Sequence, residues 1–429
     1  MTSITVPYGS GFQTAECPAG IEVQFVDSPH GEPPPPIAEL LEAAIDSPIG
    51  SPPLEELAKN KKSVAIVIND QTRPGPTKEM LDVLLSRLKI CDISDDQISL
   101  VVATGTHRAP TNEELVHMIG DDYFRRFKVV CHDCQNEDEL VFIGTTQSGL
   151  KVSINKTVAD ADLRITTGLI APHHCAGYSG GCKSIVPGVS SLETLRKHHS
   201  FPIYPYEPAM GWFHDNPFHE TALEAARMVG VDFIVNAVQN CHKEFIAVVA
   251  GDLDAAHEAG VDICYANSKI YIEKYANVIV SSPGGFPRDI DLYQSQKAVS
   301  VAEPVSTAGS IFILCAEAND GFGEGEFKSW MQETQSPAEI ISRFEKEGFT
   351  VGSNKAFLYA RALEKGEVII VTDKIDPNEL RKAKLGWAAT LQDALNYAIE
   401  KNKPDVVTVI PYANNYVLKL KDKEKRILQ

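Results

Sequence analysis

The chain has 429 residues, of which 43% are hydrophobic and 23% charged, and its formal net charge is −18 at pH 7. This length exceeds what one hydrophobic core usually organises, so we expect two domains. The acidic balance without a basic patch argues against nucleic acid and anionic membranes as partners, so any anionic ligand must be held by local positive groups.

The sequence gives no sign of export or membrane insertion. No apolar run is long enough to span a bilayer, and the first residues, MTSITVPYGSG, have neither the basic start nor the apolar core of a signal peptide. The nine cysteines are odd in number and scattered, which is typical of reduced thiols. We therefore expect a cytoplasmic protein.

Strands and helices alternate along the first half of the chain. Residues 1–60 hold proline-rich stretches and are predicted to be extended surface segments rather than a separate domain. Residues 77–88 are apolar at helical spacing, with Thr77 as the expected N-cap. Short apolar runs rich in β-branched residues predict buried strands at 64–68, 98–103, 127–130 and 163–167. This alternation indicates an α/β fold with a parallel sheet.

Polar side chains follow the carboxyl ends of three of these predicted strands. Arg73, His107 and His173 come from three separate segments. In open α/β sheets, ligands bind beyond the carboxyl ends of the strands. We therefore expect these segments to meet at one site.

A second alternating set begins near residue 270. Residues 253–275 are predicted to form a linking helix, and residues 415–429 a charged helical tail. Further strands are predicted at 277–280, 310–315, 367–372 and 405–410. We expect two Rossmann-like α/β domains with an active-site cleft between them: an N-terminal domain over 1–268, a smaller C-terminal domain over 272–400, and a tail, 403–429, that packs back on the first domain.

The densest chemistry lies in residues 168–200, GLIAPHHCAGYSGGCKSIVPGVSSLETLRKHHS. Its glycines allow backbone amides to approach an anion, and Lys183 follows them closely. The loop from Gly177 to Lys183 nearly matches the nucleotide P-loop, but Cys182 stands where that pattern has glycine, so an ATPase is disfavoured. A phosphate cradle of another kind and a surface turn with a solvated lysine both stay open.

Four histidines flank this loop in two adjacent pairs. Adjacent histidines usually point in different directions, so one member of each pair is the better functional candidate. Their imidazoles suit a borderline metal such as zinc, nickel or copper, although loop hydrogen bonds would explain them as well. The four are His173, His174, His198 and His199.

Three further motifs supply candidate residues, each with a structural alternative. Arg73 suits a carboxylate or phosphate ligand, or an ion pair with Asp70. His107, in a tight turn, suits a general base, or a hydrogen bond to the backbone. Gln294 and Lys297 offer an amide and an ammonium to a ligand, or lie on an exposed helix.

These motifs, in this order, resemble the lactate racemase family over almost the whole chain. The resemblance implies a nickel-pincer nucleotide, which is a pyridinium-3-thioamide-5-thiocarboxylic acid mononucleotide that binds nickel. It implies an isomerase, a 2-hydroxyacid racemase or epimerase that works by proton-coupled hydride transfer to this cofactor. The blocks that carry it are DQTRPGPT at 70–77, TGTHRAPT at 104–111, APHHCAGYSGGCKSIVPG at 171–188, HS at 199–200 and GGFPRDIDLYQSQK at 284–297.

The resemblance also implies a role for each matching residue. Lys183 matches the lysine that tethers the cofactor through a thioamide, and His199 matches the nickel ligand. His107 and His173 match the two acid–base catalysts. The other implied cofactor-binding residues are Asp70, Gly177, Ser179, Gly180 and Gly181. The implied substrate-binding residues are Arg73, Gln294, Lys297 and Asn354.

One position departs from the pattern for lactate. Family members that act on lactate carry a tryptophan near the substrate, where the aligned position here is Asn354. This implies a 2-hydroxyacid that is larger or more polar than lactate, and cofactor-biosynthesis enzymes are the implied partners for loading. The competing hypotheses are a zinc-dependent hydrolase or lyase on the same histidines and a non-catalytic nucleotide-binding module.

Overall fold

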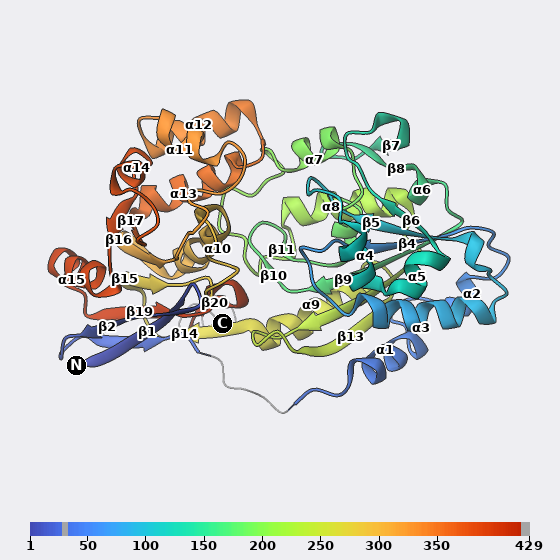
Figure 1. Cartoon of the computed structure of the whole chain (residues 1–429), viewed down its shortest axis with the longest axis horizontal. Helices are drawn as coiled ribbons and strands as arrows, with labels where there is room; N and C mark the ends of the chain where they lie inside the picture. The colour runs from blue at the N-terminus through green and yellow to red at the C-terminus, as the bar shows by residue number, and fades with distance from the viewer. Residues whose placement is uncertain (28–32, 422–429) are drawn as a thin grey trace. The chain divides into compact units, whose positions relative to one another are not determined.

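Two six-stranded sheets organise the chain in the computed structural model, which describes residues 1–27 and 33–421 (Figure 1). One compact unit comprises Gly31–Pro205 and Gly211–Asn267, and we call it the middle unit. The other comprises Met1–His30, Tyr206–Met210 and Ser268–Gln429, and we call it the terminal unit. Parallel sheets with helices occur in both, so the predicted α/β class is confirmed.

The sheet of the middle unit has the order β13-β12-β9-β4-β5-β6. Neighbouring strands pair in parallel, except that β12 and β13 are antiparallel. The strands predicted at 64–68, 98–103, 127–130 and 163–167 begin within one residue of observed strands, whereas the last two strands of this sheet were not predicted. The strands are β4 (Val64–Asn69), β5 (Ile98–Ala103), β6 (Lys128–Cys131), β9 (Leu163–Ile170), β12 (Phe233–Gln239) and β13 (Phe245–Gly251).

Alternate residues of the buried strand β4 serve two separate cores. Ile66 and Ile68 face a cluster formed with α1 (Ile37–Asp46), α2 (Leu54–Leu57) and α3 (Thr77–Ile90). Ala65 and Val67 face the opposite side of the sheet. This alternation follows from the two-residue period of a strand, so both faces of the sheet are covered.

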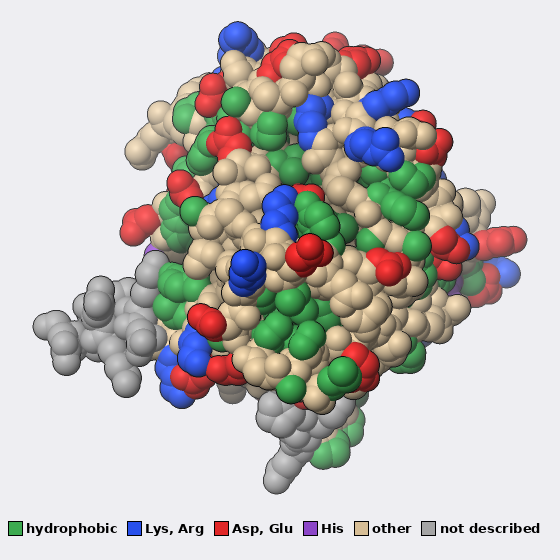
Figure 2. Space-filling view, turned by 90° about the vertical axis from the view of Figure 1, so that its left-hand side faces the viewer, with side chains coloured by type: hydrophobic (Ala, Val, Ile, Leu, Met, Phe, Trp, Pro, Cys, Tyr) green, Lys and Arg blue, Asp and Glu red, His purple; other side chains and the backbone are tan. Residues whose placement is uncertain are grey.

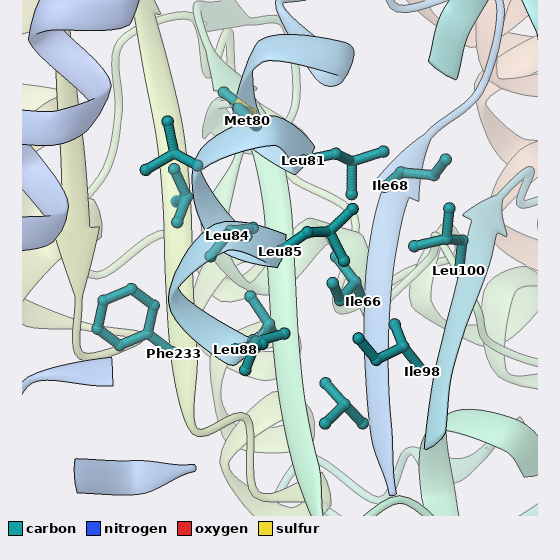
Figure 3. Packing of buried hydrophobic residues seen from close by; sticks show 14 of the residues in the cluster. Ile66, Ile68, Met80, Leu81, Leu84, Leu85, Leu88, Ile98, Leu100 and Phe233 are labelled. Atoms are coloured by element: carbon teal, nitrogen blue, oxygen red, sulfur yellow. The ribbon is translucent and has the colours of Figure 1, made fainter. Parts of the chain in front are cut away.

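Helix α3 presents its apolar stripe to the sheet (Figure 3). Met80, Leu84 and Leu88 recur at helical spacing and pack against strand residues that include Ile66. The N-cap of α3 is Pro76 rather than the predicted Thr77. The prediction of Thr77 as the cap is wrong because Thr77 is already the first residue of the helix.

The other face of this sheet is covered by α6 (Lys156–Ala159), α8 (Pro217–Val229) and the hairpin of β7 (Leu140–Thr145) and β8 (Lys151–Asn155). Cys182, Ile185 and Val186 of the glycine-rich segment pack into the same core. The glycine loop is therefore anchored on the sheet. The remaining helices of the unit are α4 (Asn112–Ile119), α5 (Asp121–Arg126), α7 (Leu192–His198) and α9 (Ala255–Ser268).

The sheet of the terminal unit is parallel throughout, with the order β18-β17-β16-β15-β19-β3. Its strands are β3 (Glu22–Phe25), β15 (Ala276–Ser281), β16 (Ser306–Cys315), β17 (Gly366–Val371), β18 (Gly386–Ala388) and β19 (Val406–Ile410). The hairpin of β1 (Thr2–Tyr8) and β2 (Gly11–Cys17) and helix α15 (Leu391–Asn402) share a core with this sheet. The other helices are α10 (Leu292–Ala302), α11 (Phe327–Glu333), α12 (Pro337–Glu347), α13 (Ser353–Lys365) and α14 (Pro377–Lys382).

The division of the chain differs from the expected domains at both ends. Residues 1–27 form β1 to β3 of the terminal unit, not connectors of an N-terminal domain. The predicted linking helix ends at Ser268, where β14 (Lys269–Ile272) begins. The predicted helical tail instead contains β20 (Val417–Leu420), which pairs with β14, while residues 422–429 lie outside the described part of the chain. Pairing between distant segments overrides the local helical pattern in this tail.

Two further features are the distribution of charge on the surface and the length of the helices. On the face shown in Figure 2, lysine and arginine side chains are interspersed with acidic ones. Among residues 1–27 and 33–421, no helix is both long and apolar enough to cross a membrane.

Candidate active site

The carboxyl ends of three neighbouring strands carry the candidate residues of the middle unit. In this sheet, β4 lies between β9 and β5 and pairs with both in parallel. Asp70 follows β4, His107 lies in the turn after β5, and His173 follows β9. Parallel strands end at one edge of a sheet, so segments far apart in sequence emerge at the same edge.

A buried carboxylate holds the imidazole of His107. Nδ1 of His107 lies 2.7 Å from Oδ2 of Asp70. The other carboxylate oxygen, Oδ1, accepts a 2.8 Å hydrogen bond from the Thr72 hydroxyl. Burial raises the pKa of Asp70, but hydrogen bonds from His107 and Thr72 and the positive charges nearby outweigh it and keep the pKa below its usual value. An ionised carboxylate only accepts, so Nδ1 of His107 donates and Nε2 carries the lone pair.

Arg73 lies beside this pair and is exposed to solvent. Its guanidinium donates to the carbonyl and hydroxyl oxygens of Thr72, at 3.2 Å each. The same hydroxyl lies 3.3 Å from Nδ1 of His107. An exposed guanidinium next to a histidine is suited to bind the carboxylate of a small ligand.

His173 is held in the opposite tautomer. It lies in β10 (Pro172–His173), directly across from Gly177 of β11 (Gly177–Tyr178). Its Nδ1 accepts hydrogen bonds from the backbone N–H of Ala176 at 3.2 Å and of Cys175 at 3.4 Å. Because a backbone N–H can only donate, Nδ1 holds the lone pair, and the proton of the neutral ring is on Nε2.

Ser179 ties the glycine loop to the segment between β9 and His173. Its hydroxyl donates to the Leu169 carbonyl at 2.7 Å and accepts from the Ala171 N–H at 3.0 Å. The Ser179 carbonyl lies 3.0 Å from Nε2 of His257 on α9. These contacts fix the loop on both sides.

Two glycines of the loop are required by close packing. A Cβ on Gly177 would lie 2.2 Å from the carbonyl oxygen of Trp212, and one on Gly181 would lie 2.5 Å from Nδ1 of His257. Their φ angles, +75° and +54°, also disfavour any other residue. Neither position can carry a side chain without moving its neighbour.

Backbone hydrogen bonds join the turn before His107 to the Lys183 loop. The N–H of Gly105 donates to the Gly188 carbonyl at 2.9 Å, and the N–H of Gly188 donates to the Lys183 carbonyl at 3.0 Å. The N–H of Lys183 in turn donates to the Gly180 carbonyl at 3.2 Å. The positions of Lys183 and of the His107 turn are therefore coupled.

Phe218 brings Lys183 and His199 together. The Lys183 ammonium lies 5.2 Å from the centroid of the Phe218 ring, and the His199 ring lies 4.8 Å from it. Burial lowers the pKa of Lys183, and the charge of Arg73 acts in the same direction. A lysine with a depressed pKa supplies more of the neutral, nucleophilic amine.

The two adjacent histidines at the end of α7, His198 in the helix and His199 as its C-cap, make different contacts. Nδ1 of His199 donates to the Leu195 carbonyl at 3.0 Å, so Nε2 carries the lone pair. Burial and the charge of Lys183 lower the pKa of His199 to about 3, which keeps the ring neutral. His198 is fully buried and donates through Nε2 to the Phe218 carbonyl at 2.8 Å. His198 is therefore placed to support the fold.

Two more buried histidines lie beneath the loop, His219 on α8 and His257 on α9. Their rings are 5.8 Å apart, and burial lowers their pKa values to about 3 and about 4. Within the described part of the chain, no group of three His, Cys, Asp or Glu side chains is arranged to hold a metal ion. The residues predicted for a metal therefore provide a single candidate ligand, His199, rather than a protein cage.

The remaining predicted residues lie in the terminal unit. Asp291 caps α10 by accepting the Gln294 N–H at 2.6 Å, and Lys297 donates to the side-chain oxygen of Gln294 at 3.4 Å. Asn354 lies in the first turn of α13 and is 7% exposed, and its Oδ1 has no hydrogen-bond partner. A buried acceptor without a donor is costly, which suits a residue that meets a polar ligand.

Sequence patterns did not identify Phe218 or Asn236. The Phe218 ring lies against both Lys183 and His199, and Asn236 on β12 accepts the Gly181 N–H at 2.7 Å. The available signal was an asparagine inside an otherwise apolar strand, since Asn is disfavoured there unless it has a partner.

Comparisons with known proteins agree with the motifs. Residues 8–211 match the model of the lactate racemase N-terminal domain, and residues 272–416 match that of the lactate racemase C-terminal domain. The chain is 34% identical over 392 residues to the lactate racemase of Lactiplantibacillus plantarum, covering 89% of this chain and 91% of that protein. It is 31% identical over 419 residues to the lactate racemase of Thermoanaerobacterium thermosaccharolyticum, covering 96% and 98%.

Solved structures give the same result for the fold. The lactate racemase apoprotein from Thermoanaerobacterium thermosaccharolyticum superimposes with a TM-score of 0.88 at 29% identity, covering 97% of this chain and 100% of that one. A protein from Thermotoga maritima superimposes with a TM-score of 0.65 at 20% identity, which shows a shared fold. The match covers 87% of this chain and 100% of that one.

Proposed function

The chain belongs to the lactate racemase family, and from this premise we propose that it racemises or epimerises a 2-hydroxyacid. The observation that carries the proposal is the contrast between His107, whose Nε2 has a lone pair, and His173, whose Nε2 has a proton. Inverting a carbon that bears a hydroxyl by hydride transfer requires a base that takes the hydroxyl proton of one enantiomer. It also requires an acid that protonates the oxygen of the other enantiomer. Two Rossmann-like domains with an active-site cleft and a cytoplasmic location belong to the same proposal.

The residues present fit a nickel-pincer nucleotide tethered to Lys183. Lys183 has a depressed pKa, as an amine that must be acylated requires, and glycine positions beside it leave room for close backbone approach. His199 donates through Nδ1 to a backbone carbonyl, the arrangement usual for a metal-ligating imidazole. When bound, this group would supply an acceptor and donor for the hydride on the substrate Cα.

The protein's own groups manage the protons. His107 takes the hydroxyl proton of one enantiomer at Nε2, and the Asp70 carboxylate stabilises the imidazolium that results. His173 returns a proton from Nε2 to the oxygen of the opposite enantiomer, and the roles exchange in the reverse direction. Each histidine must therefore work in both protonation states.

Arg73, Gln294 and Lys297 are proposed to bind the substrate carboxylate, so that its motion between the two proton transfers is limited to rotation. Asn354 offers a buried oxygen that lacks a donor, and a hydroxyl group on the substrate would supply one. We therefore favour a 2-hydroxyacid that is larger or more polar than lactate. Enzymes that make the cofactor are the proposed partners for loading.

The decisive test is cofactor loading. Co-expression with cofactor-making enzymes should raise the intact mass above the sequence mass and give stoichiometric nickel, and Lys183→Ala should abolish both. Loaded protein is then incubated with single enantiomers of lactate, 2-hydroxybutyrate and polyhydroxylated 2-hydroxyacids, and the opposite stereoisomer is measured. Turnover of none of these acids by loaded protein would overturn the proposal. Stoichiometric zinc without added mass would favour the zinc-dependent hydrolase or lyase, although such enzymes use three protein ligands.

A further inference from the structure

Asn236 is a fully buried amide in the middle of β12, directly opposite Gly168 of β9 in the parallel register. Its Oδ1 accepts a 2.7 Å hydrogen bond from the N–H of Gly181. Because that N–H can only donate, the contact fixes which end of the amide faces the loop. The Nδ2 at the other end has no hydrogen-bond partner.

Two glycines leave room for this amide. A Cβ on Gly180 would lie 2.6 Å from Oδ1 of Asn236, and one on Gly168 would lie 3.2 Å from its Nδ2. Gly180 also has a φ of +85°, which other residues rarely adopt. The strand, the amide and the loop are therefore mutually fitted, so a shift of Asn236 must shift Gly180 and Gly181.

The backbone hydrogen bonds of the loop connect Asn236 to Lys183. Gly181 begins the short 3-10 turn Gly181–Ser184, and the Gly180 carbonyl accepts the N–H of Lys183 at 3.2 Å. Asn236 thus packs against Gly180, which precedes the turn, and holds Gly181, its first residue, by a hydrogen bond. A buried donor without a partner is destabilising, so an amide at this position is poorly explained by stability alone.

We propose that Asn236 is a positioning residue for Lys183, which fixes the Gly180–Gly181 turn so that the lysine amine is presented for attachment of the cofactor. The inference rests on the proposed function, because it assumes that Lys183 is the tether. It predicts that the hydrogen-bond acceptor, rather than the size of the side chain, is what the site requires.

Four variants separate this role from a structural one. Asn236→Leu keeps the volume without the acceptor, and Asn236→Ser removes the amide without adding bulk, in case the leucine variant does not fold. Asn236→Asp keeps an acceptor for Gly181. The control is Thr166→Val, which alters another fully buried polar side chain without a hydrogen-bond partner, on the neighbouring strand β9.

Two readouts are needed, and the first is the fraction of protein that gains cofactor mass on co-expression. We expect Asn236→Leu and Asn236→Ser to be loaded about 10-fold less or worse, because a misplacement near 1 Å can cost about 100-fold in a bond-forming step. Asn236→Asp should retain most of the loading, and Thr166→Val should equal the wild type.

The second readout uses unloaded protein and needs no cofactor. Lys183 is labelled with pyridoxal phosphate and borohydride, and its labelled peptide is quantified by mass spectrometry. Release of the turn should change the labelling rate several-fold in the leucine and serine variants and leave it unchanged in Thr166→Val. Normal loading and labelling of either folded loss variant would overturn the inference, whereas failure of the wild type to load would overturn the proposed function instead.

Discussion

The carboxylate of Asp70 is almost fully buried, yet its pKa lies below the usual value. Burial alone would raise it, and the hydrogen bonds from His107 and Thr72 reverse that effect. Asp70 is therefore ionised at neutral pH and keeps the Nδ1 proton on His107. The family resemblance implies that Asp70 contacts the cofactor, and its hydrogen bond with His107 gives it a proposed second role.

Replacing Asp70 by Asn should lower the rate of racemisation even when the proteins are compared at equal cofactor content. An amide can donate to Nδ1 of His107, which places the proton on Nε2 and removes the base. By analogy with other carboxylate-oriented histidines, we expect kcat to fall about 100-fold or more. The measurement is kcat for both enantiomers with loaded protein of matched nickel content.

The matched control is Asp95→Asn, which removes an exposed carboxylate that pairs with Arg126. Exposed pairs contribute little, so this variant should retain wild-type kcat. An Asp70→Asn enzyme with unchanged kcat in both directions would show that His107 does not depend on Asp70 for its tautomer.

Only part of this residue-level detail could be predicted from the sequence. Local composition selected the dense segment that holds Lys183 and the four histidines, whereas only the family resemblance chose His173 and His199 among them. Phe218 and Asn236 come from α8 and β12 and belong to no motif. Their contacts exist because the sheet brings distant segments together, and a local pattern carries no record of such contacts.

At the level of elements, the glycine loop combines two separate demands on one backbone. Gly181 has a φ of +54°, and a Cβ there would lie 2.5 Å from Nδ1 of His257. Gly149, in the turn between β7 and β8, has a φ of +81° with no atom within 4 Å of an added Cβ. The two glycines share the conformational demand and differ in the steric one.

Gly181→Ala and Gly149→Ala should therefore separate the two effects. Both variants pay about 1–2 kcal/mol for a left-handed residue with a side chain. Gly181→Ala should lose further stability, by about 1–3 kcal/mol, because His257 must move in a packed interior. Urea unfolding of both proteins measures the difference, and equal losses would show that the loop relaxes freely around His257.

The elements themselves were predictable where a strand is short, apolar and buried. Strands β4 and β5 begin at Val64 and Ile98, where the apolar runs begin. Strand β20 was not, because it is only four residues long, lies in a charged tail and forms by pairing with β14, nearly 150 residues earlier. Such long-range pairing depends on the whole fold rather than on neighbouring residues.

Across the whole molecule, buried neutral histidines oppose the effect of net charge on acid stability. The chain carries a charge of −18, so protonation on mild acidification reduces repulsion and should stabilise the folded state. His219 and His257, with pKa values near 3 and 4, resist protonation when folded, whereas the unfolded chain protonates them near the usual value of about 6.5.

The sign of the effect follows from this difference. The unfolded state binds more protons below pH 6.5, so the contribution of each histidine is complete above that pH and is lost progressively as the pH falls toward its folded pKa. For His257 the loss is about 2 kcal/mol at pH 5. We expect the free energy of unfolding, measured in urea, to fall between pH 7 and 5, although charge repulsion alone predicts a rise.

His257→Gln tests the assignment, because it removes one of these titrations. Between pH 6 and 5, its free energy of unfolding should depend on pH less steeply than that of the wild type, by about 1 kcal/mol per pH unit. The matched control is His117→Gln on α4, which replaces an exposed histidine. Equal slopes in His257→Gln and the wild type would mean that His257 takes up a proton equally in the folded and the unfolded chain. Burial would then not keep the ring beside Gly181 neutral.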